Sequence, residues 1–335
     1  MLDLLGIAGI LLIFAVTFII TFIATPIIAN EMRKRGITGK DIHKPTKDPV
    51  PEMCGLAILL GLTVGAAGYA VLFPSAAPEV VAFVGTFLIA GAIGIRDDLR
   101  PLGARAKPLL IAVACLPILI LKTYKPLAEV PLVGTIRLTL IYPFLVPVAL
   151  AVTANSVNMM DVMNGSMPGT VGIISAAAVV ILLLSGQTQI AALAAGLLGA
   201  MLAFYYFNRF PAKVFDGDTG SLAVGAAIGA IAILGSIEAA MIVALIPHIM
   251  NAFSGLASVG GLYERRQIRQ RPTTLRDDGK LEASVEKGAP VTLTRMILAA
   301  GPLGEQDIVR GMMALTLISS ILAIFTYWVT VVGRV

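Results

Sequence analysis

A short stretch between two long apolar runs carries four polar side chains suited to chemistry. Asn155, Asn158, Asp161 and Asn164 fall within ten residues, and the first three are spaced three apart, close to one face of a helix. Amide and carboxylate oxygens are hard ligands of the kind that Mg²⁺ prefers. A polar helix cap is the alternative interpretation, but one cap does not need four such groups. We therefore expect this stretch to contribute to a divalent-cation site.

A pair of adjacent carboxylates ends another apolar run. Asp97 and Asp98 are neighbours in the chain, and two like charges so close together favour a bound cation or a shared proton. The alternative is a solvated helix end with Arg96 and Arg100 as ion partners. That alternative weakens if other acidic groups gather at the same place.

Two more acidic segments border apolar runs. The turn that contains Asp216 and Asp218 has glycines that permit close approach of backbone to a ligand. Phe215 beside this turn could stack on a base, although loop packing explains it equally well. Glu52 stands just before an apolar run, where a carboxylate is often only a partner of the helix dipole.

Basic residues suited to phosphate are found in the same kind of position. Lys107 directly precedes the apolar run that opens at Pro108. A cluster of arginines in the last long loop would either contact anionic lipid or bind phosphate in bidentate fashion. This cluster consists of Arg265, Arg266, Arg269, Arg271 and Arg276.

The composition predicts an all-α polytopic membrane protein with about ten transmembrane helices. The chain is 57% hydrophobic and 13% charged, with a mean hydropathy of +0.90, and a spanning helix needs about 20 apolar residues. The runs lack the alternation of a β-barrel, and no basic patch with aromatics suggests nucleic-acid binding. The first run is expected to be a retained span rather than a cleaved signal peptide. The ten runs begin near Leu4, Leu56, Pro78, Pro108, Leu138, Pro168, Gln189, Ser221, Glu238 and Ile308.

The distribution of basic residues predicts the orientation. All but four of the 25 Lys and Arg residues fall in alternate loops, so that side is expected to be cytoplasmic and both termini to face out. We expect one integral membrane domain over residues 1–335, with residues 260–307 as a long cytoplasmic loop that is irregular over 273–290. A short external hairpin is expected within 122–137.

All the acidic and phosphate-binding candidates fall on this cytoplasmic side. Acids and amides suggest a divalent metal, and the basic residues suggest phosphates, so the site is suited to transfer between a soluble nucleotide compound and a lipid phosphate. An ion-coupled transporter is the competing class. It would place polar groups near the bilayer midplane and show repeated halves, and the sequence shows neither pattern.

The motifs resemble those of the polyprenyl-phosphate N-acetylhexosamine-1-phosphate transferases. Within that family the likeness is greatest to the dolichyl-phosphate GlcNAc-1-phosphotransferases of eukaryotes, with archaeal counterparts, and it runs nearly end to end. The matching segments are 39–44 (GKDIHK), 51–55 (PEMCG), 94–99 (GIRDDL) with Lys107, 155–158 (NSVN) with 164–165 (NG), 214–219 (VFDGDT), 279–282 (GKLE) and 298–305 (LAAGPLGE).

The resemblance implies a reaction and a set of roles. The phosphate of a polyprenol would attack the β-phosphorus of UDP-GlcNAc and release UMP, the first lipid-linked step of glycan assembly such as N-glycosylation. Metal ligands for Mg²⁺, with Mn²⁺ as a substitute, would be Asn158 and Asp218. Catalytic groups beside the phosphates would be Asp97, Asp98 and Lys107, with Asp161 as an unassigned acid. Substrate-binding groups would be Glu52, Asn155, Asn164, Phe215, Arg269 and Arg271, with Asn164 and Phe215 on the uracil.

Some positions depart from the family pattern. Pro101 stands where the eukaryotic enzymes have Asn, Asp161 resembles the bacterial branch, and Arg269-Gln-Arg271 aligns with the arginine motif only through a gap. The alternative substrate is therefore another UDP-N-acetylhexosamine with undecaprenyl phosphate as acceptor, although the bacterial histidine-rich loop is missing. The expected location is the plasma membrane if the source is prokaryotic, with the active site cytoplasmic and a homodimer as the expected assembly.

Overall fold

The protein is a bundle of long helices with short strands in the loops. The computed structural model describes residues 4–42, 48–130, 133–262, 268 and 270–332. The helices of the bundle are α1 (Leu4–Lys34), α2 (Leu56–Leu72), α3 (Ala77–Leu99), α4 (Ala106–Ala112), α5 (Leu116–Leu121), α6 (Tyr142–Met160), α7 (Ser166–Leu184), α8 (Thr188–Asn208), α9 (Gly217–Leu234), α10 (Glu238–Ala244), α11 (Ile246–Ser258) and α13 (Glu305–Tyr327).

The predicted apolar runs fall largely in these helices, with the run from Pro108 divided between α4 and α5 and the run from Glu238 between α10 and α11; the run from Leu138 becomes helical at Tyr142. By length and composition, seven helices among the described residues can cross a membrane, and α10 with α11 forms an eighth candidate bent by 66°. Helix α2 and the α4–α5 segment, 106–121, are apolar but shorter. The structure therefore confirms a polytopic helical membrane protein, and the count of ten spans stays a prediction.

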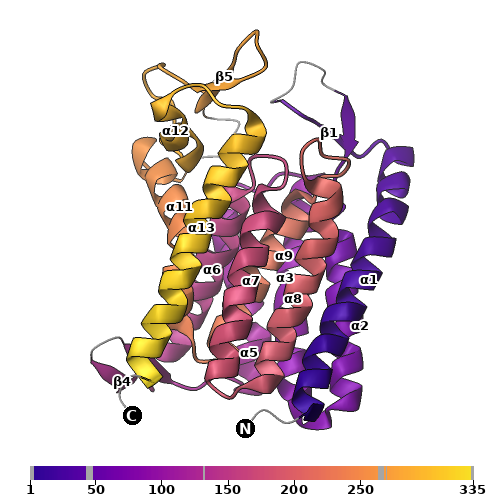
Figure 1. Ribbon diagram of the computed structural model, residues 1–335, viewed down its shortest axis with the longest axis vertical. Helices are drawn as coiled ribbons and strands as arrows, with labels where there is room; N and C mark the ends of the chain where they lie inside the picture. The colour runs from indigo at the N-terminus through magenta and orange to yellow at the C-terminus, as the bar shows by residue number, and fades with distance from the viewer. Residues whose placement is uncertain (1–3, 43–47, 131–132, 263–267, 269, 333–335) are drawn as a thin grey trace.

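The two ends of the bundle differ in what they carry (Figure 1). The start of α1 and the end of α13 lie at one end, together with the hairpin of β3 (Leu127–Val130) and β4 (Gly134–Arg137). This hairpin confirms the strand pair expected within 122–137. The opposite end carries the paired strands β1 (Thr38–Lys40) and β2 (Pro49–Pro51) and the last long loop.

The last long loop is more ordered than the sequence suggests. Strands β5 (Thr273–Leu275) and β6 (Leu281–Ala283) pair antiparallel, and the short helix α12 (Leu293–Ile297) follows. Leu281 is buried and also exchanges two backbone hydrogen bonds with Leu303. The prediction of an irregular segment is therefore wrong over 273–283, because three-residue strands are too short to show an alternating pattern, and it is confirmed over 284–290, which contain no helix or strand.

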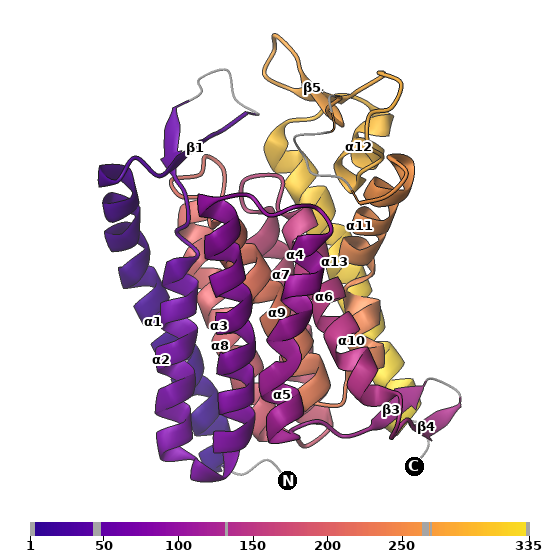
Figure 2. The same cartoon turned by 180° about the vertical axis from the view of Figure 1, so that it is seen from behind.

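Helix α9 is the centre of the bundle. Within its apolar window 89% of the residues are buried, more than in any other span of the described chain. It packs against α3 on one side and α6 on another, as the view from behind also shows (Figure 2). A Cβ at Gly225 would lie only 2.6 Å from Ala154 Cα of α6, and one at Gly94 of α3 only 2.3 Å from the Asp218 carbonyl oxygen. Small residues thus bring three backbones into contact, as is common in membrane helix packing.

This close packing predicts that Gly225→Ala destabilises the protein. The added methyl group meets the backbone of α6, which cannot rotate away, so we expect a loss of about 1–3 kcal/mol and a lower Tm in detergent. Gly68→Ala is the matched control, because a Cβ at this helical glycine has no neighbour within 4 Å. Equal Tm values for the two variants would contradict the packing described above.

Candidate active site

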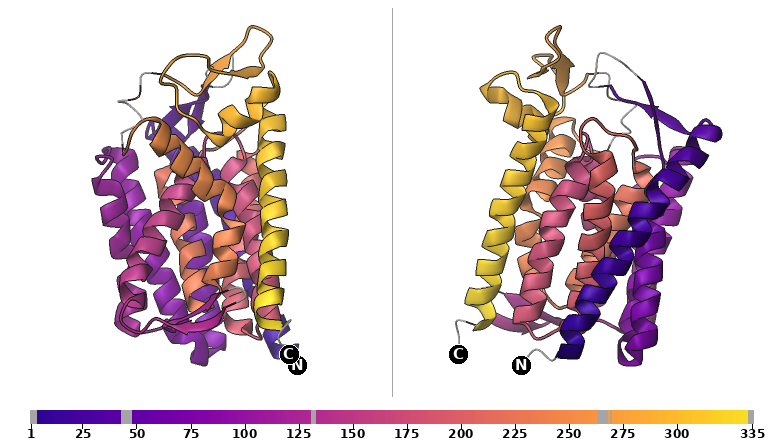
Figure 3. Two further views of the ribbon diagram at one scale, coloured as in Figure 1. Left: turned by 90° about the vertical axis from the view of Figure 1, so that its left-hand side faces the viewer. Right: turned by 45° about the vertical axis from the view of Figure 1, so that its right-hand side comes forward.

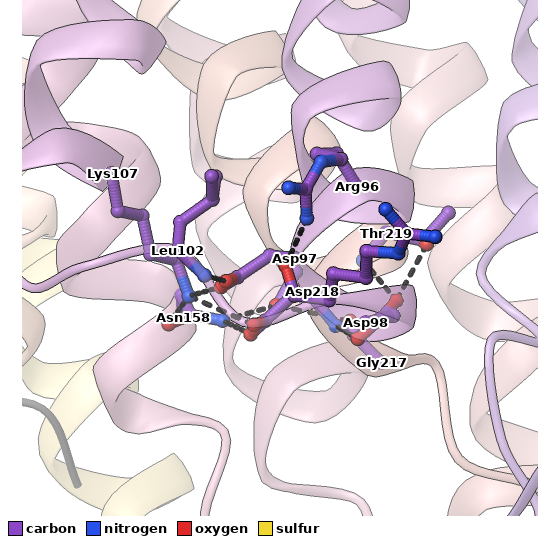
Figure 4. A network of polar contacts seen from close by, with 11 residues as sticks. Arg96, Asp97, Asp98, Leu102, Lys107, Asn158, Gly217, Asp218 and Thr219 are labelled. Atoms are coloured by element: carbon purple, nitrogen blue, oxygen red, sulfur yellow. Dashed lines mark hydrogen bonds and ion pairs between the residues drawn. The ribbon is translucent and has the colours of Figure 1, made fainter.

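The ammonium group of Lys107 joins three side chains from three other helices. Its Nζ lies 2.8 Å from Asp97 Oδ2, 2.9 Å from Asp218 Oδ2 and 3.2 Å from Asn158 Oδ1. These residues come from α4, α3, α9 and α6, and Figure 4 shows their side chains pointing toward one another. The Lys107 side chain is only 16% exposed. A buried cation is tolerated when oxygens surround it in this way.

Asn158 is held from two sides by α9. Its Nδ2 donates to Asp218 Oδ1 at 2.5 Å and to Ser221 Oγ at 2.7 Å. Ser221 was not among the predicted site residues. Its spacing of three from Asp218, on the first turn of a helix, is the signal that would have found it.

Asp98 binds backbone rather than pointing at a ligand. Its two carboxylate oxygens accept the N–H groups of Asp218 and Thr219 at 2.8 and 2.9 Å, and Thr219 Oγ1 donates at 2.6 Å. A helix begins with unpaired N–H groups and a positive dipole end, so a carboxylate from another helix stabilises it. Asp98 thus fixes the start of α9, which carries Asp218. Arg96 donates to the Arg100 carbonyl, so the alternative of these arginines as partners of the aspartates is wrong.

Asn164 lies in a second group of polar contacts at the start of α7. Its Nδ2 donates to Asp41 Oδ2 at 2.9 Å, and its backbone N–H donates to Glu305 Oε1 at 2.7 Å. The next N–H, that of Gly165, donates to Asn208 Oδ1 at 3.0 Å. Of these partners, Asp41 and Glu305 lie in motif segments of the sequence but had not been singled out, and Asn208 was missed.

Phe215 and Glu52 lie together beside the β1–β2 strands. The Phe215 N–H donates to the Pro51 carbonyl at 2.8 Å, which ties the turn before α9 to the segment before α2. A Cβ at Gly39 would lie 3.1 Å from the Phe215 ring and 3.3 Å from Glu52 Oε2. Any larger residue at position 39 would therefore press on both side chains.

The remaining predicted residues lie outside the Lys107 contacts. The Asn155 amide donates to the Ala151 carbonyl of its own helix at 2.8 Å. Asp161, which follows α6, shares a hydrogen bond with Asp216 instead. Arg271 is exposed just before β5, and Arg269 lies outside the described residues.

The contact between the buried Asp216 and the half-buried Asp161 favours a shared proton. Asp216 is 2% exposed. Its burial, and after that the neighbouring Asp161 carboxylate, raise the pKa of Asp216 well above its ordinary value. These two carboxyls were predicted as a turn acid and a member of the amide stretch, and only the fold brings them into contact.

The donor set permits a divalent cation that also binds phosphates and water. Within the described ranges, no group of three or more His, Cys, Asp or Glu side chains is placed to hold a metal by itself. Asp218 and Asn158, however, offer a carboxylate and an amide side by side. Mg²⁺ typically takes one or two carboxylates and completes its shell with phosphate oxygens and water.

Comparison with known proteins finds a glycosyl transferase family and relatives that are named as phosphotransferases or transferases. Residues 80–236 match the model of a family described as glycosyl transferase family 4. A provisionally named UDP-N-acetylglucosamine–dolichyl-phosphate N-acetylglucosaminephosphotransferase of Sulfolobus acidocaldarius is 30% identical, over 98% of this chain and 99% of the relative. The phospho-N-acetylmuramoyl-pentapeptide-transferase of Halalkalibacterium halodurans is 34% identical, over 70% of this chain and 77% of its own length.

The raised pKa of Asp216 predicts how stability depends on pH. A carboxyl with a raised folded-state pKa stabilises the fold below its unfolded pKa of about 4, and this contribution is lost as the pH rises through the folded pKa. Asp216→Asn cannot ionise, so the Tm of this variant should rise relative to wild type between pH 5 and pH 8. Asp277→Asn, at an exposed loop position, is the control and should show a constant difference. A constant difference for Asp216→Asn as well would contradict the assignment.

Proposed function

The chain belongs to glycosyl transferase family 4, and from this we propose that it transfers N-acetylglucosamine 1-phosphate from UDP-N-acetylglucosamine to a polyprenyl phosphate of the dolichyl type. The relative of S. acidocaldarius, aligned over nearly its whole length, is named for that reaction. The products are UMP and a polyprenyl diphosphate that carries N-acetylglucosamine.

The observation that carries this proposal is the convergence on Lys107. Asp97, Asn158 and Asp218 meet its ammonium group within 3.2 Å, in a partly enclosed position at a helix-bundle end. Such polar groups are costly in a membrane protein unless they serve a ligand. A cation beside a carboxylate and an amide is a setting that suits a diphosphate and its metal ion.

In the proposed reaction an oxygen of the lipid phosphate forms a bond to the β-phosphorus. The bond between the β-phosphorus and the bridging oxygen breaks, and UMP leaves with the electron pair. A phosphate monoester is already largely ionised near neutral pH, so the site needs no strong base. The protein's part is then to position the two phosphates and to balance their charge.

Lys107 would supply one of the positive charges, held in place by Asp97. Asp218 and Asn158 would hold Mg²⁺, or Mn²⁺ in its place, which when bound neutralises charge on the diphosphate. Asp98 would act as a positioning residue, because its bonds to the start of α9 set where Asp218 lies. This division gives the two adjacent aspartates different tasks.

The uridine would bind on the side of Phe215 and Asn164. Stacking on the half-buried Phe215 ring and a hydrogen bond from Asn164 are the proposed contacts, with Glu52 ordering the segment beside Phe215. Arg271 and Arg269 of the last long loop would bind phosphate. Asp161 would act indirectly, through its contact with Asp216. Asn155 would stabilise α6 through its hydrogen bond to the Ala151 carbonyl.

The finer topology belongs to the same proposal. Ten spans with both termini outside would place the Lys107 site on the cytoplasmic side, where the basic loops lie. The location would be the plasma membrane of a prokaryotic source, and a homodimer the assembly. Transfer of another N-acetylhexosamine phosphate to undecaprenyl phosphate is the second candidate, supported by the relatives named for the muramoyl-pentapeptide reaction.

The reaction itself can be tested by the release of UMP. Purified protein with Mg²⁺ should release UMP from UDP-N-acetylglucosamine only when a polyprenyl phosphate is added, and a chelator should stop the release. Release in the absence of lipid acceptor, or none across several chain lengths, would refute the proposal. A panel of UDP-sugars separates the two candidate substrates.

The metal assignment predicts that Asp218→Ala lowers kcat by about 10²–10³-fold or more. The change removes a carboxylate that no neighbouring group replaces at the same position. Asp277→Ala serves as the control, since Asp277 is exposed in a loop, and it should keep full activity. A loss of less than tenfold in Asp218→Ala would show that Asp218 is not a metal ligand.

A further inference from the structure

A polar pocket, separate from the contacts of Lys107, lies between the end of α8 and the start of α13. Its volume is about 490 Å³, and its walls come from Tyr205 to Lys213 and from Gln306 to Met313. Helices α7, α8 and α13 lie toward the viewer in Figure 1, whereas α4, which carries Lys107, lies toward the viewer in Figure 2. The helices that line this pocket and the helix that carries Lys107 thus lie on opposite sides of the bundle (Figure 3 gives two further views). The two sites approach each other at Asn164, which also lines this pocket.

The pocket concentrates positive charge. Arg209, Lys213 and Arg310 line it, and none of the described lining residues is acidic. The Arg209 guanidinium and the Lys213 ammonium lie 5.5 and 5.7 Å from the centre of the same Tyr206 ring. Two like charges beside one ring repel each other, and cation–π attraction offsets this only in part. A bound anion would reduce this repulsion.

Arg310 is the third basic group and faces the pocket from α13. It pairs with Asp307 at 2.9 Å, but both side chains are more than half exposed, at 72% and 54%. An exposed pair one helical turn apart contributes little, so it leaves Arg310 able to bind another anion. Basic groups from two sides of one pocket can together bind the non-bridging oxygens of a phosphate group.

The surroundings favour an amphipathic ligand. Leu202 lies one helical turn before Tyr206 on α8, and Leu317 lies one turn after Met313 on α13; both are about half exposed. Apolar surface thus continues from the pocket along the helices, while aromatic side chains at its mouth are typical of a membrane interface. Basic pockets between membrane helices of this kind bind lipid headgroups.

We propose that this pocket binds the phosphate of an anionic membrane lipid through Arg209, Lys213 and Arg310. The bound phosphate would bridge α8 and α13. The same two helices hold the turn before α7, because Asn208 accepts the Gly165 N–H and Glu305 accepts the Asn164 N–H. The lipid therefore stabilises the hydrogen bonds that Asn208 and Glu305 make to the turn at Asn164 and Gly165. A lower KM for the sugar nucleotide is a second consequence, which rests on the proposed function.

The test is thermal unfolding in detergent micelles doped with dioleoyl-phosphatidylglycerol, which needs no turnover. Wild type should gain about 2–4 °C in Tm, and phosphatidylcholine should give no gain. The triple variant R209Q/K213Q/R310Q should bind the anionic lipid about 100-fold more weakly, at about fivefold for each charge removed. If the triple variant does not fold, the single variants K213Q and R310Q replace it, and each should bind the anionic lipid about fivefold more weakly.

The matched control is R33Q/K34Q/R35Q. Arg33 and Lys34 end α1 on the side of β1, and Arg35 follows them. Arg35 pairs locally with Glu31 as Arg310 does with Asp307. This control should keep the full gain with phosphatidylglycerol. An equal gain with phosphatidylcholine, an undiminished gain in R209Q/K213Q/R310Q, or an equal loss in the control would overturn the proposal. sn-Glycerol 1-phosphate distinguishes the source: a gain as large as with the lipid would show a soluble phosphate ligand and overturn the lipid assignment.

Discussion

A single buried ammonium group sets the arrangement at the functional end of the molecule. Lys107 must have oxygen partners because it is largely removed from solvent, and it finds them on three other helices. The ends of α3, α4, α6 and α9 are therefore fixed relative to one another by the same contacts that would receive substrate phosphates. Architecture and chemistry are coupled here: a shift of any one helix would unpair a buried charge.

Small residues of α3 and α9 make this coupling geometrically feasible. Without close approach at Gly94 and Gly225 the backbones of α3, α6 and α9 would stand farther apart, and Asp97 could not reach the same cation as Asn158 and Asp218. Asp98 then accepts hydrogen bonds from two N–H groups at the start of α9, which would otherwise be unpaired. Neighbouring aspartates thus serve different ends because adjacent helical positions point about 100° apart.

The same end of the bundle presents two kinds of electrostatic environment. Around Lys107 the oxygens of Asp97 and Asp218 balance the charge of a single ammonium group. Between α8 and α13, Arg310 pairs with the exposed Asp307 and the described lining residues include no acidic group, which suits the anion proposed above. The turn at Asn164 and Gly165 contacts both regions, so changes in one can reach the other through Asn208 and Glu305.

The sequence by itself determined the class of the protein and most of the candidate residues. Hydropathy is a local property, so the apolar runs appear largely as helix. The candidate polar residues lie at one end because they belong to alternate loops of the chain. The hairpin within 122–137 was also predictable from its turn and β-branched residues. Side-chain direction was not predictable, since it depends on how helices pack and rotate against each other. Only the tertiary structure therefore decided that Asp98 binds backbone, that Asp161 pairs with Asp216, that Asn155 bonds its own helix, and that Ser221, Asp41 and Glu305 belong beside the predicted residues.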